Sequence, residues 1–400
     1  MLEVGRIAYG VLQAFQPPGR WLFVKIFVLG FCIAAVGRLI PWTPVRTFSK
    51  RSRRILIGLW AVALLALGCF FSGTGLIVTR AYAEFTAVHD RPAYASLTAN
   101  VGSYLGVYEP GAPASYDPVE RFSQATKTRP GIALYYSTWG LPFQQAFVAT
   151  AYSHHVVTLI QMMPSGPGVS MAAIARGADD SYLKSFAASV RDFRHPVIMG
   201  FAPEMNGNWY AWGYTKVKPA TWVAAWRHVV TVFRSVGADN VTWLWTSNQV
   251  YNGSGPLTEY WPGNQYVNWV GIDAYFVPAE HKFSEVIIPT LKQIRRLTNR
   301  PVIISETGVA PGAGKPAVLE QIFAGVRAQG LLGFVYFDGN QQEDADYHYR
   351  WRLEDSQSAV DEYGLLARHN ASLPHPPVPS LPEPEQHGTG APTPAGSRSP

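Results

Sequence analysis

The stretch Pro196-Val-Ile-Met-Gly-Phe-Ala-Pro-Glu-Met-Asn-Gly-Asn-Trp-Tyr-Ala-Trp-Gly213 changes character in its middle. Its first half is a short apolar run behind a proline, which predicts a buried β-strand. Its second half is polar and aromatic and begins at Glu204. This combination suits a sugar site, because rings stack on sugar faces, amides bind hydroxyl groups and a carboxyl group can protonate a glycosidic oxygen.

Seven further apolar runs lie between residues 84 and 371, with patterns of helical period between several of them. The eight predicted strands are 103–108, 132–136, 156–162, 197–201, 241–246, 269–275, 302–305 and 334–337. Eight strands that alternate with helices fit a (β/α)8 TIM barrel, which typically needs about 250 residues. A doubly wound open sheet is the alternative, but no early strand is followed by a glycine-rich phosphate-binding turn.

Two glutamates end predicted strands. Glu204 follows the fourth strand, and Glu306, in Pro301-Val-Ile-Ile-Ser-Glu-Thr-Gly308, follows the seventh. Functional residues of such barrels come from the carboxyl ends of the strands, so both side chains are expected over the barrel mouth. Two carboxyl groups about 5–5.5 Å apart can cleave a glycosidic bond with retention, one as acid and one as nucleophile. The alternative for each residue is a structural ion pair with Arg or Lys.

Four motifs together resemble glycoside hydrolase family 26, which contains β-mannanases and related retaining β-glycanases on (β/α)8 barrels. They are Glu204-Met-Asn-Gly-Asn-Trp-Tyr210, Tyr260-Trp-Pro-Gly-Asn264, Gly271-Ile-Asp-Ala-Tyr275 and Ile303-Ile-Ser-Glu-Thr-Gly308. The resemblance covers roughly residues 100 to 368. It implies that Glu204 is the acid/base and Glu306 the nucleophile. It also implies that Tyr275 orients the nucleophile, that Trp209 shapes the sugar site and that Asp273 binds a sugar hydroxyl.

Two positions depart from the family pattern. Pro203 stands where many members have His, and Gln161 stands on the third strand where family mannanases carry a His that contacts the sugar. The substrate is therefore expected to be a β-linked polysaccharide, mannan or a related β-glycan. Further candidates for substrate contact are Tyr136, Trp139, Asn206, Tyr210, Trp245, Asn248 and Trp351.

No motif indicates a metal or a cofactor. His154 and His155 are adjacent, so on a strand their rings would face opposite sides. Neither paired cysteines nor a His-x-x-x-His spacing occurs in the chain. The total charge of +6 comes from residues 1–54, which hold nine Lys and Arg and one Glu, leaving −2 for the remainder. A near-neutral main domain argues against a nucleic-acid partner. A monomer is expected.

The N-terminal region predicts a membrane anchor. Residues 55–79 form an uncharged apolar run of 25 residues, longer than the roughly 20 that span a bilayer. The basic segment 1–54 precedes this run and is expected to stay cytoplasmic, so the following domain is exported. Residues 21–40 are a second candidate span, which would make the anchor two-pass. Cleavage after Ala83 would release the domain instead.

The sequence thus predicts an anchored, extracytoplasmic domain over residues 84–371 and a disordered tail rich in Pro, Gly and Ser over residues 372–400. The expected activity is retaining hydrolysis of a β-linked polysaccharide. Two alternatives stay open. The first is a barrel that binds polysaccharide without cutting it, and the second is a transglycosylase that uses the same two carboxyl groups on a cell-surface polysaccharide.

Overall fold

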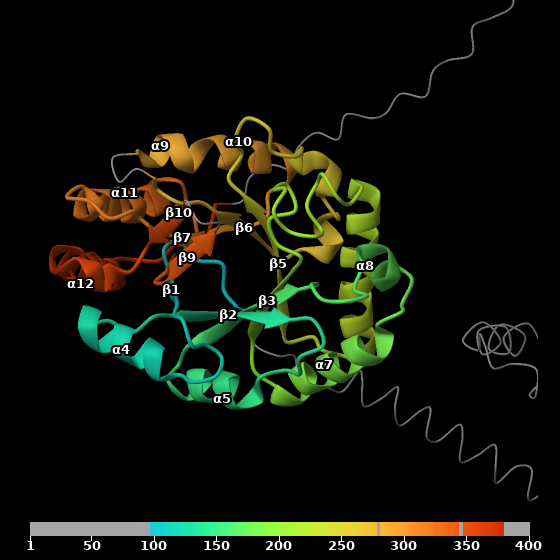
Figure 1. The fold of residues 1–400 in the computed structure, drawn as a ribbon. Helices are drawn as coiled ribbons and strands as arrows, with labels where there is room; N and C mark the ends of the chain where they lie inside the picture. The colour runs from blue at the N-terminus through green and yellow to red at the C-terminus, as the bar shows by residue number, and fades with distance from the viewer. Residues whose placement is uncertain (1–96, 278–280, 344–346, 380–400) are drawn as a thin grey trace, which may run out of the picture. The chain divides into compact units, whose positions relative to one another are not determined.

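The computed structural model describes residues 97–277, 281–343 and 347–379. Eight parallel strands close into a barrel in chain order, because β1 pairs with both β2 and β8 (Figure 1). The strands are β1 (Tyr104–Tyr108), β2 (Ile132–Thr138), β3 (Val157–Met163), β4 (Val197–Phe201), β5 (Val241–Asn248), β6 (Trp269–Asp273), β7 (Val302–Thr307) and β8 (Gly333–Phe337). The predicted barrel is therefore confirmed, and closure excludes the open-sheet alternative.

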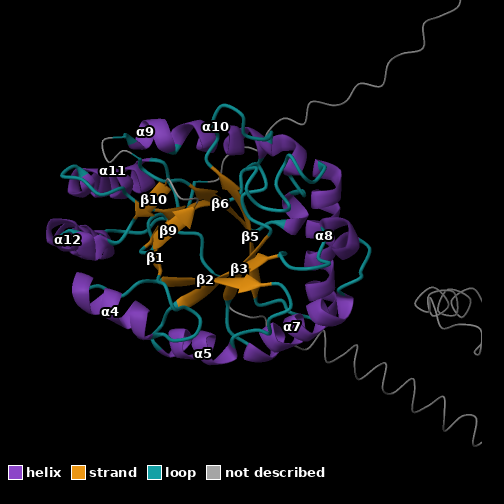
Figure 2. Ribbon diagram, viewed as in Figure 1, coloured by secondary structure: helices purple, strands orange, loops and turns teal. Residues whose placement is uncertain are grey.

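Helices surround the barrel as an outer ring (Figure 2). The described helices are α4 (Asp117–Thr126), α5 (Gln145–Ser153), α6 (Met171–Ala175), α7 (Asp180–Phe193), α8 (Pro219–Val236), α9 (Phe283–Val286), α10 (Ile288–Leu297), α11 (Lys315–Ala328) and α12 (Gln357–Ser372). After β8 the chain forms an antiparallel hairpin of β9 (Asn340–Glu343) and β10 (Tyr347–Arg350), which stands outside the barrel sheet.

The longest helix in the described ranges, α8, shows how sequence sets the outer layer. It begins at Pro219, whose missing N–H is no loss in the first turn. It ends at Val236 and is capped by Gly237, whose φ of 78° only glycine adopts readily. Its apolar residues recur every three or four positions and are buried against the barrel. From β5, Trp243 and Trp245 point outward into this same layer.

The barrel interior changes from apolar to polar toward the carboxyl ends of the strands. The lower part is filled by Ile132, Leu134, Leu159, Ile198, Leu244, Ile303, Val335 and their neighbours. Above them lie buried Gln161, Thr246 and Ser305. Gly200 and Gly271 leave room for these polar side chains. A Cβ at Gly200 would lie 1.9 Å from Gln161 Oε1, and a Cβ at Gly271 would lie 2.3 Å from Ser305 Oγ.

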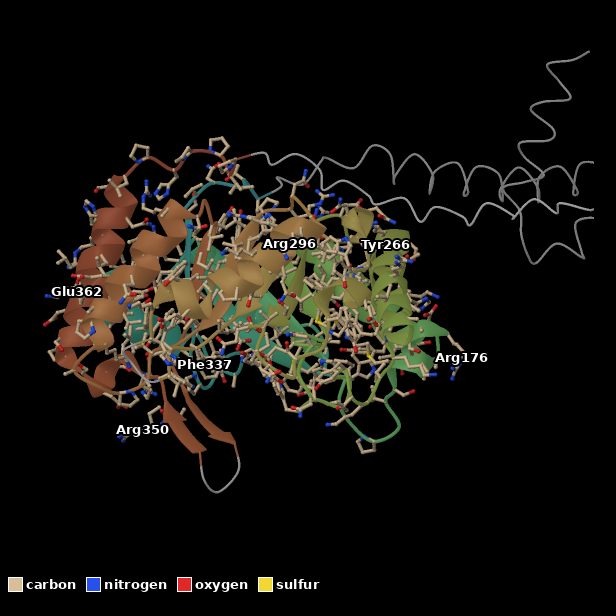
Figure 3. All side chains as sticks on the ribbon, turned by 90° about the horizontal axis from the view of Figure 1, so that it is seen from above. Arg176, Tyr266, Arg296, Phe337, Arg350 and Glu362 are labelled. Carbon is tan, nitrogen blue, oxygen red and sulfur yellow. The ribbon has the colours of Figure 1, made fainter. Side chains whose placement is uncertain are left out.

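The two ends of the described chain meet at the amino-terminal ends of the strands. Val101 N donates to Pro376 O at 2.8 Å, and Val378 N donates to Ala99 O at 2.8 Å. Residues 373–379, placed in the tail by the sequence, thus lie against the segment before β1. In a side view Arg296 and Tyr266 lie at this end of the barrel, and Phe337 and Arg350 lie at the opposite end (Figure 3).

The proposed anchor (55–79), the basic segment (1–54), the second candidate span (21–40) and the tail beyond Pro379 lie outside the described residues. Within the described part of the chain, no helix combines the length and the apolar character needed to cross a bilayer.

Candidate active site

Glu204 is positioned by an irregular backbone just past β4. Ala202 and Glu204 have φ values of 46° and 55°, in the left-handed region that non-glycine residues seldom adopt. Hydrogen bonds to both neighbouring strands hold this conformation: Ala202 N donates to Met162 O at 2.9 Å, and Glu204 N donates to Thr246 O at 3.0 Å. Backbone held this way against its preference is common at functional sites.

Two side chains donate hydrogen bonds to the Glu204 carboxylate. Trp209 Nε1 lies 2.9 Å from Oε2, and Asn248 Nδ2 lies 2.6 Å from Oε1. Asn248 is itself fixed by buried Asn206, which accepts from Asn248 N and donates to Asn248 O, both at 2.9 Å. Pro203 also contributes, because its carbonyl accepts from Trp212 Nε1 at 2.7 Å. The motif after β4 therefore builds the support of its own glutamate.

Glu306 owes its position to an irregularity in β7. Ile272 pairs with Ile304, but Asp273 pairs with Glu306, so β7 carries one extra residue at this point. Ser305 donates to Asp273 Oδ1 at 2.5 Å inside the barrel, while the adjacent Glu306 faces the mouth. Tyr275 donates to Glu306 Oε2 at 2.8 Å. The contact between Tyr275 and Glu306 is the one that the resemblance implied.

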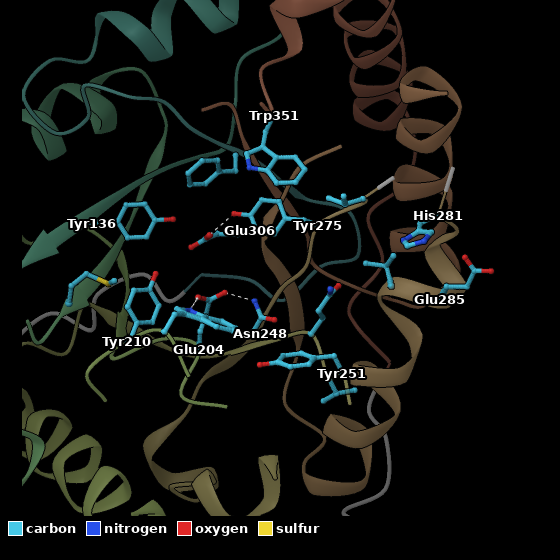
Figure 4. A pocket seen from close by; sticks show the side chains of 17 residues that line it. Tyr136, Glu204, Tyr210, Asn248, Tyr251, Tyr275, His281, Glu285, Glu306 and Trp351 are labelled. Carbon is cyan, nitrogen blue, oxygen red and sulfur yellow. Dashed lines mark hydrogen bonds between the residues drawn. The ribbon is translucent and has the colours of Figure 1, made fainter. Parts of the chain in front are cut away.

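The two glutamates face each other across a cleft of about 780 Å³ at the carboxyl ends of the strands (Figure 4). One wall is aromatic: Trp209 and Tyr251 stack with ring centroids 6.4 Å apart. On the opposite side Trp351 packs on Tyr275 with centroids 4.7 Å apart. The lining also includes Tyr136, Met163, Tyr210, Asn248, Gln249, Val250, Val277, His281, Glu285, Val286 and Phe337.

The structure brings some sequence candidates into the cleft and leaves others out. Glu204, Glu306, Tyr275, Trp209, Tyr210, Tyr136, Asn248 and Trp351 line it. Gln161, Asp273 and Asn206 are fully buried beneath or beside it. Trp139 packs on Tyr182 and Phe201, and Trp245 donates to Tyr260 O in the layer between barrel and helices. Neither tryptophan lines the cleft.

The sequence did not single out Tyr251, His281 and Glu285, which also line the cleft. Tyr251 follows the fifth strand by only three residues, and that position was a usable signal. His281 lies in the loop after β6. Glu285 lies in α9, a helix of four residues that is too short to show a helical pattern in the sequence.

Burial and mutual repulsion control the ionisation of the site. Burial, together with the charge of Glu204, raises the pKa of Glu306 from 4.5 to about 8, although hydrogen bonds from Tyr136 and Tyr275 lower it. Burial also raises the pKa of Asp273 well above its usual range, and the charge of Glu306 adds to this. Burial and the neighbouring carboxylates thus act against a second negative charge in this site.

Glu204 and Glu306 together can hold the single proton that retaining chemistry requires. Two interacting carboxyl groups titrate as a pair, and a raised pKa keeps one proton on the pair at neutral pH. Cleavage uses this proton on Glu204, while Glu306 acts as the carboxylate.

Hydrogen bonds from two buried side chains fix the segment that carries Trp351. Lys315 Nζ, almost fully buried, donates to Trp351 O at 3.1 Å and to Arg352 O at 2.7 Å. Tyr336 donates to Trp351 O at 2.6 Å. Gly308 lets the indole approach, because a Cβ there would lie 3.0 Å from the ring. These contacts fix Trp351 over Tyr275.

Glu109, Asp338 and Glu354 bring carboxylate oxygens within 4.8 Å of one another, a spacing that could hold a metal ion. Donors from the protein itself already bind two of these three carboxylates. Asp338 accepts from Leu353 N at 2.6 Å, and Arg352 pairs with Glu354 at 3.1 Å. Burial, with the charge of Asp338, raises the pKa of Glu109 to about 10. The cluster thus disfavours a charge on Glu109, and through the bond from Leu353 N to Asp338 it anchors the segment that follows Trp351.

A (β/α)8 barrel with two carboxyl groups facing each other in an aromatic cleft has the architecture of a glycoside hydrolase. Residues 144–313 match the model of Glycosyl hydrolase family 26. This match confirms the resemblance to that family that the four motifs indicated.

Several known proteins with different names are similar in sequence to the chain. Endoglucanase H of Acetivibrio thermocellus is 25% identical over 282 residues, which cover 66% of this chain and 30% of that protein. β-1,3-Xylanase TXYA of a Vibrio species is 28% identical, covering 48% and 42%. Mannan endo-1,4-β-mannosidase of Bacillus subtilis is 27% identical, covering 40% and 45%. The chain thus spans less than half the length of each relative.

Solved structures share the fold. A modular endo-β-1,4-mannanase of Cellulomonas fimi superposes with a TM-score of 0.52 at 17% identity, covering 68% of this chain and 71% of that one. Mannanase BCman of Bacillus subtilis gives a TM-score of 0.50 at 18% identity, covering 68% and 85%. At this level of identity the likeness concerns the barrel alone.

Proposed function

We propose that the chain is a membrane-anchored, extracytoplasmic retaining glycoside hydrolase that cleaves a β-linked polysaccharide. The observation that carries the proposal is the pair Glu204 and Glu306, which face each other in the cleft with Tyr275 hydrogen-bonded to Glu306. The basic segment 1–54 and the apolar run 55–79 support the anchor and its orientation.

In the first step the Glu306 carboxylate attacks the anomeric carbon, the glycosidic C–O bond breaks, and Glu204 gives its proton to the departing oxygen. In the second step Glu204 takes a proton from water as the water oxygen attacks the same carbon and releases Glu306. Both carboxyl groups then return to their starting states. An acceptor sugar in place of water would make the same site a transglycosylase.

The names of the relatives support a class of substrate and do not single out one polymer. Those names refer to an endoglucanase, a β-1,3-xylanase and a mannan endo-1,4-β-mannosidase, and the last two state a β-linkage. In this chain Gln161 lies under the cleft, bonded to Thr246 at 3.2 Å, and does not line it. Because Trp209, Tyr251 and Trp351 line the cleft, a bound polymer is expected to contact their rings.

The test is release of reducing ends from β-mannan, mixed-linkage β-glucan, β-xylans and cellulose by the full-length protein in detergent. Activity on one polymer that disappears in both Glu204→Gln and Glu306→Gln supports the proposal and fixes the polymer. Retained binding of a polymer without cleavage would instead select the non-catalytic barrel. Products longer than the substrate would select transglycosylation.

We expect Tyr275→Phe to shift the acid limb of the pH profile of kcat/KM to higher pH. The lost hydroxyl is a donor that favours ionised Glu306, so its removal raises the Glu306 pKa further. Since the nucleophile acts only when ionised, activity at neutral pH falls by about ten- to a hundred-fold. Tyr152→Phe, at an exposed position of α5, is the matched control and should leave the profile in place. An unshifted limb in Tyr275→Phe would contradict the assigned role of Tyr275.

A further inference from the structure

Basic side chains gather at the end of the barrel opposite the cleft. We call this end the basic floor and define it by ten residues that lie in the last turns of helices, in the connections to the next strands, or at the end of α12. They are Lys127, Arg129, Arg191, Arg194, Arg234, Arg295, Arg296, Arg300, Arg327 and Arg368. The same segments contain two acids, Asp192 and Asp239. Because residues 55–400 together carry −2, this excess of cations is local.

Carboxylates leave most of this charge uncompensated. Within the described ranges, Arg191 is the member of the floor with a carboxylate at ion-pair distance, Asp192 at 2.7 Å. Others donate to neutral backbone carbonyls, Arg300 to Asn264 O at 2.7 Å and Arg368 to Thr126 O at 3.0 Å. Cations in last helical turns complement the helix dipole, but Arg129 and Arg300 lie outside any helix, so the dipole does not explain the whole pattern.

Two hollows open on the floor, and arginines line both. One of about 440 Å³ lies between Arg295, Arg300, Arg327 and the segment 376–379. Another of about 430 Å³ is lined by Arg129, Arg368, His155 and His375. Guanidinium groups bind phosphate oxygens in a planar, two-point fashion, and both hollows therefore suit phosphate headgroups.

The chain leaves the barrel at this same floor. The segment before β1 pairs with residues 376–378 there. Only 17 residues, 80–96, separate Leu97 from the apolar run that ends at Thr79. Seventeen residues span at most about 60 Å even when fully extended. A bilayer that holds the apolar run is thus within reach of the end of the barrel that carries the positive charge.

We propose that the basic floor binds the anionic headgroups of the lipid surface in which the chain is anchored. This inference rests on the membrane anchor of the proposed function. It gives the domain an orientation in which the floor faces the lipid and the cleft faces the polymer. Arg296 of the floor and Phe337 of the cleft lie at opposite ends of the barrel (Figure 3). The partner is lipid headgroups, because the short connection keeps this surface nearest and the charges are complementary.

The experiment uses the full chain reconstituted in vesicles, with a protease site inserted between Ala83 and Glu84. After cleavage, the barrel is expected to stay on vesicles that contain phosphatidylglycerol at low salt. It is expected to leave them at high salt, where charges are screened, and to leave neutral phosphatidylcholine vesicles at any salt. Sedimentation and immunoblotting measure the retained fraction.

A charge-reversed floor, Arg129→Glu with Arg194→Glu and Arg296→Glu, should lower retention on anionic vesicles at least about ten-fold. All three residues are exposed. The matched control reverses three exposed cations away from the floor, Arg121→Glu, Arg176→Glu and Lys282→Glu, and should be retained. Thermal unfolding of both variants checks that the barrel is folded.

Three results would overturn the proposal: equal release from anionic and neutral vesicles at low salt, equal loss in the floor and control variants, or retention that survives high salt. A failed anchor gives a different result. In that case the uncut chain does not sediment with neutral vesicles, and the floor is still judged by its salt-dependent binding to anionic ones.

Discussion

The Glu306→Gln variant is expected to lose at least about 10³-fold in kcat while still binding the polysaccharide. The amide has the shape of the carboxylate, so the hydrogen bond from Tyr275 can persist on its oxygen. The amide oxygen does not attack an anomeric carbon, and no glycosyl-enzyme forms. Reducing-end assays give kcat, and affinity electrophoresis in a gel that contains the polymer gives binding. Glu259→Gln makes the same chemical change at an exposed position and should retain full activity.

The same variant should change how stability depends on pH. Folding raises the pKa of Glu306 from 4.5 to about 8, so the folded protein binds more protons than the unfolded chain between these values. Glu306 therefore contributes stability that is complete below pH 4.5 and is lost as the pH rises through about 8. Glutamine does not titrate, and its contribution stays constant.

Thermal unfolding between pH 5 and pH 9 tests this coupling. We expect the wild-type Tm to fall with rising pH more steeply than the Tm of Glu306→Gln, and we expect the variant to be the more stable protein at the alkaline end. Parallel curves would show that Glu306 is not held in the neutral form by its surroundings. Undiminished kcat in Glu306→Gln would remove it as the nucleophile.

The barrel and its two glutamates were predictable from sequence for the same physical reason. Strands buried on both faces read as continuous apolar runs, and the residue at which such a run turns polar marks a strand end. Glu204 stands at such a change, and Glu306 closes a run of the same kind. The alternation of side chains along β5 was also readable from the sequence. Leu244, Thr246 and Asn248 face the barrel interior, so Trp245 had to face the helices.

Other features of the site depend on contacts between segments far apart in the chain. The extra residue in β7, which lets Ser305 reach Asp273 while Glu306 faces the cleft, follows from pairing with β6 and leaves no mark in composition. The raised pKa of Glu306 depends on burial and on Glu204, which is supplied by another strand. The role of Lys315 beneath Trp351 has no local signal, since a lysine in a first helical turn reads as exposed.

The Glu204→Ala variant is expected to lose about 10²- to 10⁴-fold on polysaccharide, with a much smaller loss in the first step on an aryl glycoside. A sugar alkoxide departs slowly unless an acid protonates it, whereas a nitrophenolate departs without help. The difference between the two substrates thus reports the acid role directly. Pre-steady-state release of nitrophenol gives the first step, and reducing-end assays give the polysaccharide rate.

Removing the Glu204 carboxylate also leaves a space with two donors. Trp209 Nε1 and Asn248 Nδ2, which lie 2.9 Å and 2.6 Å from its oxygens, lose their acceptor. A small anion such as azide fits this position and can attack the glycosyl-enzyme without a general base. We expect azide to restore turnover of the aryl glycoside by Glu204→Ala and to yield a β-glycosyl azide, because two inversions at one carbon retain configuration.

Glu204→Gln supplies the control for azide rescue. Its amide fills the same space and keeps an oxygen for both donors, so azide should restore little or no activity. If Glu204→Ala were equally impaired on both substrates and gave no azide product, the acid/base role would belong to another residue. A glycosyl azide of inverted configuration would show that azide had attacked the substrate itself, and the double-displacement mechanism through Glu306 would then be wrong.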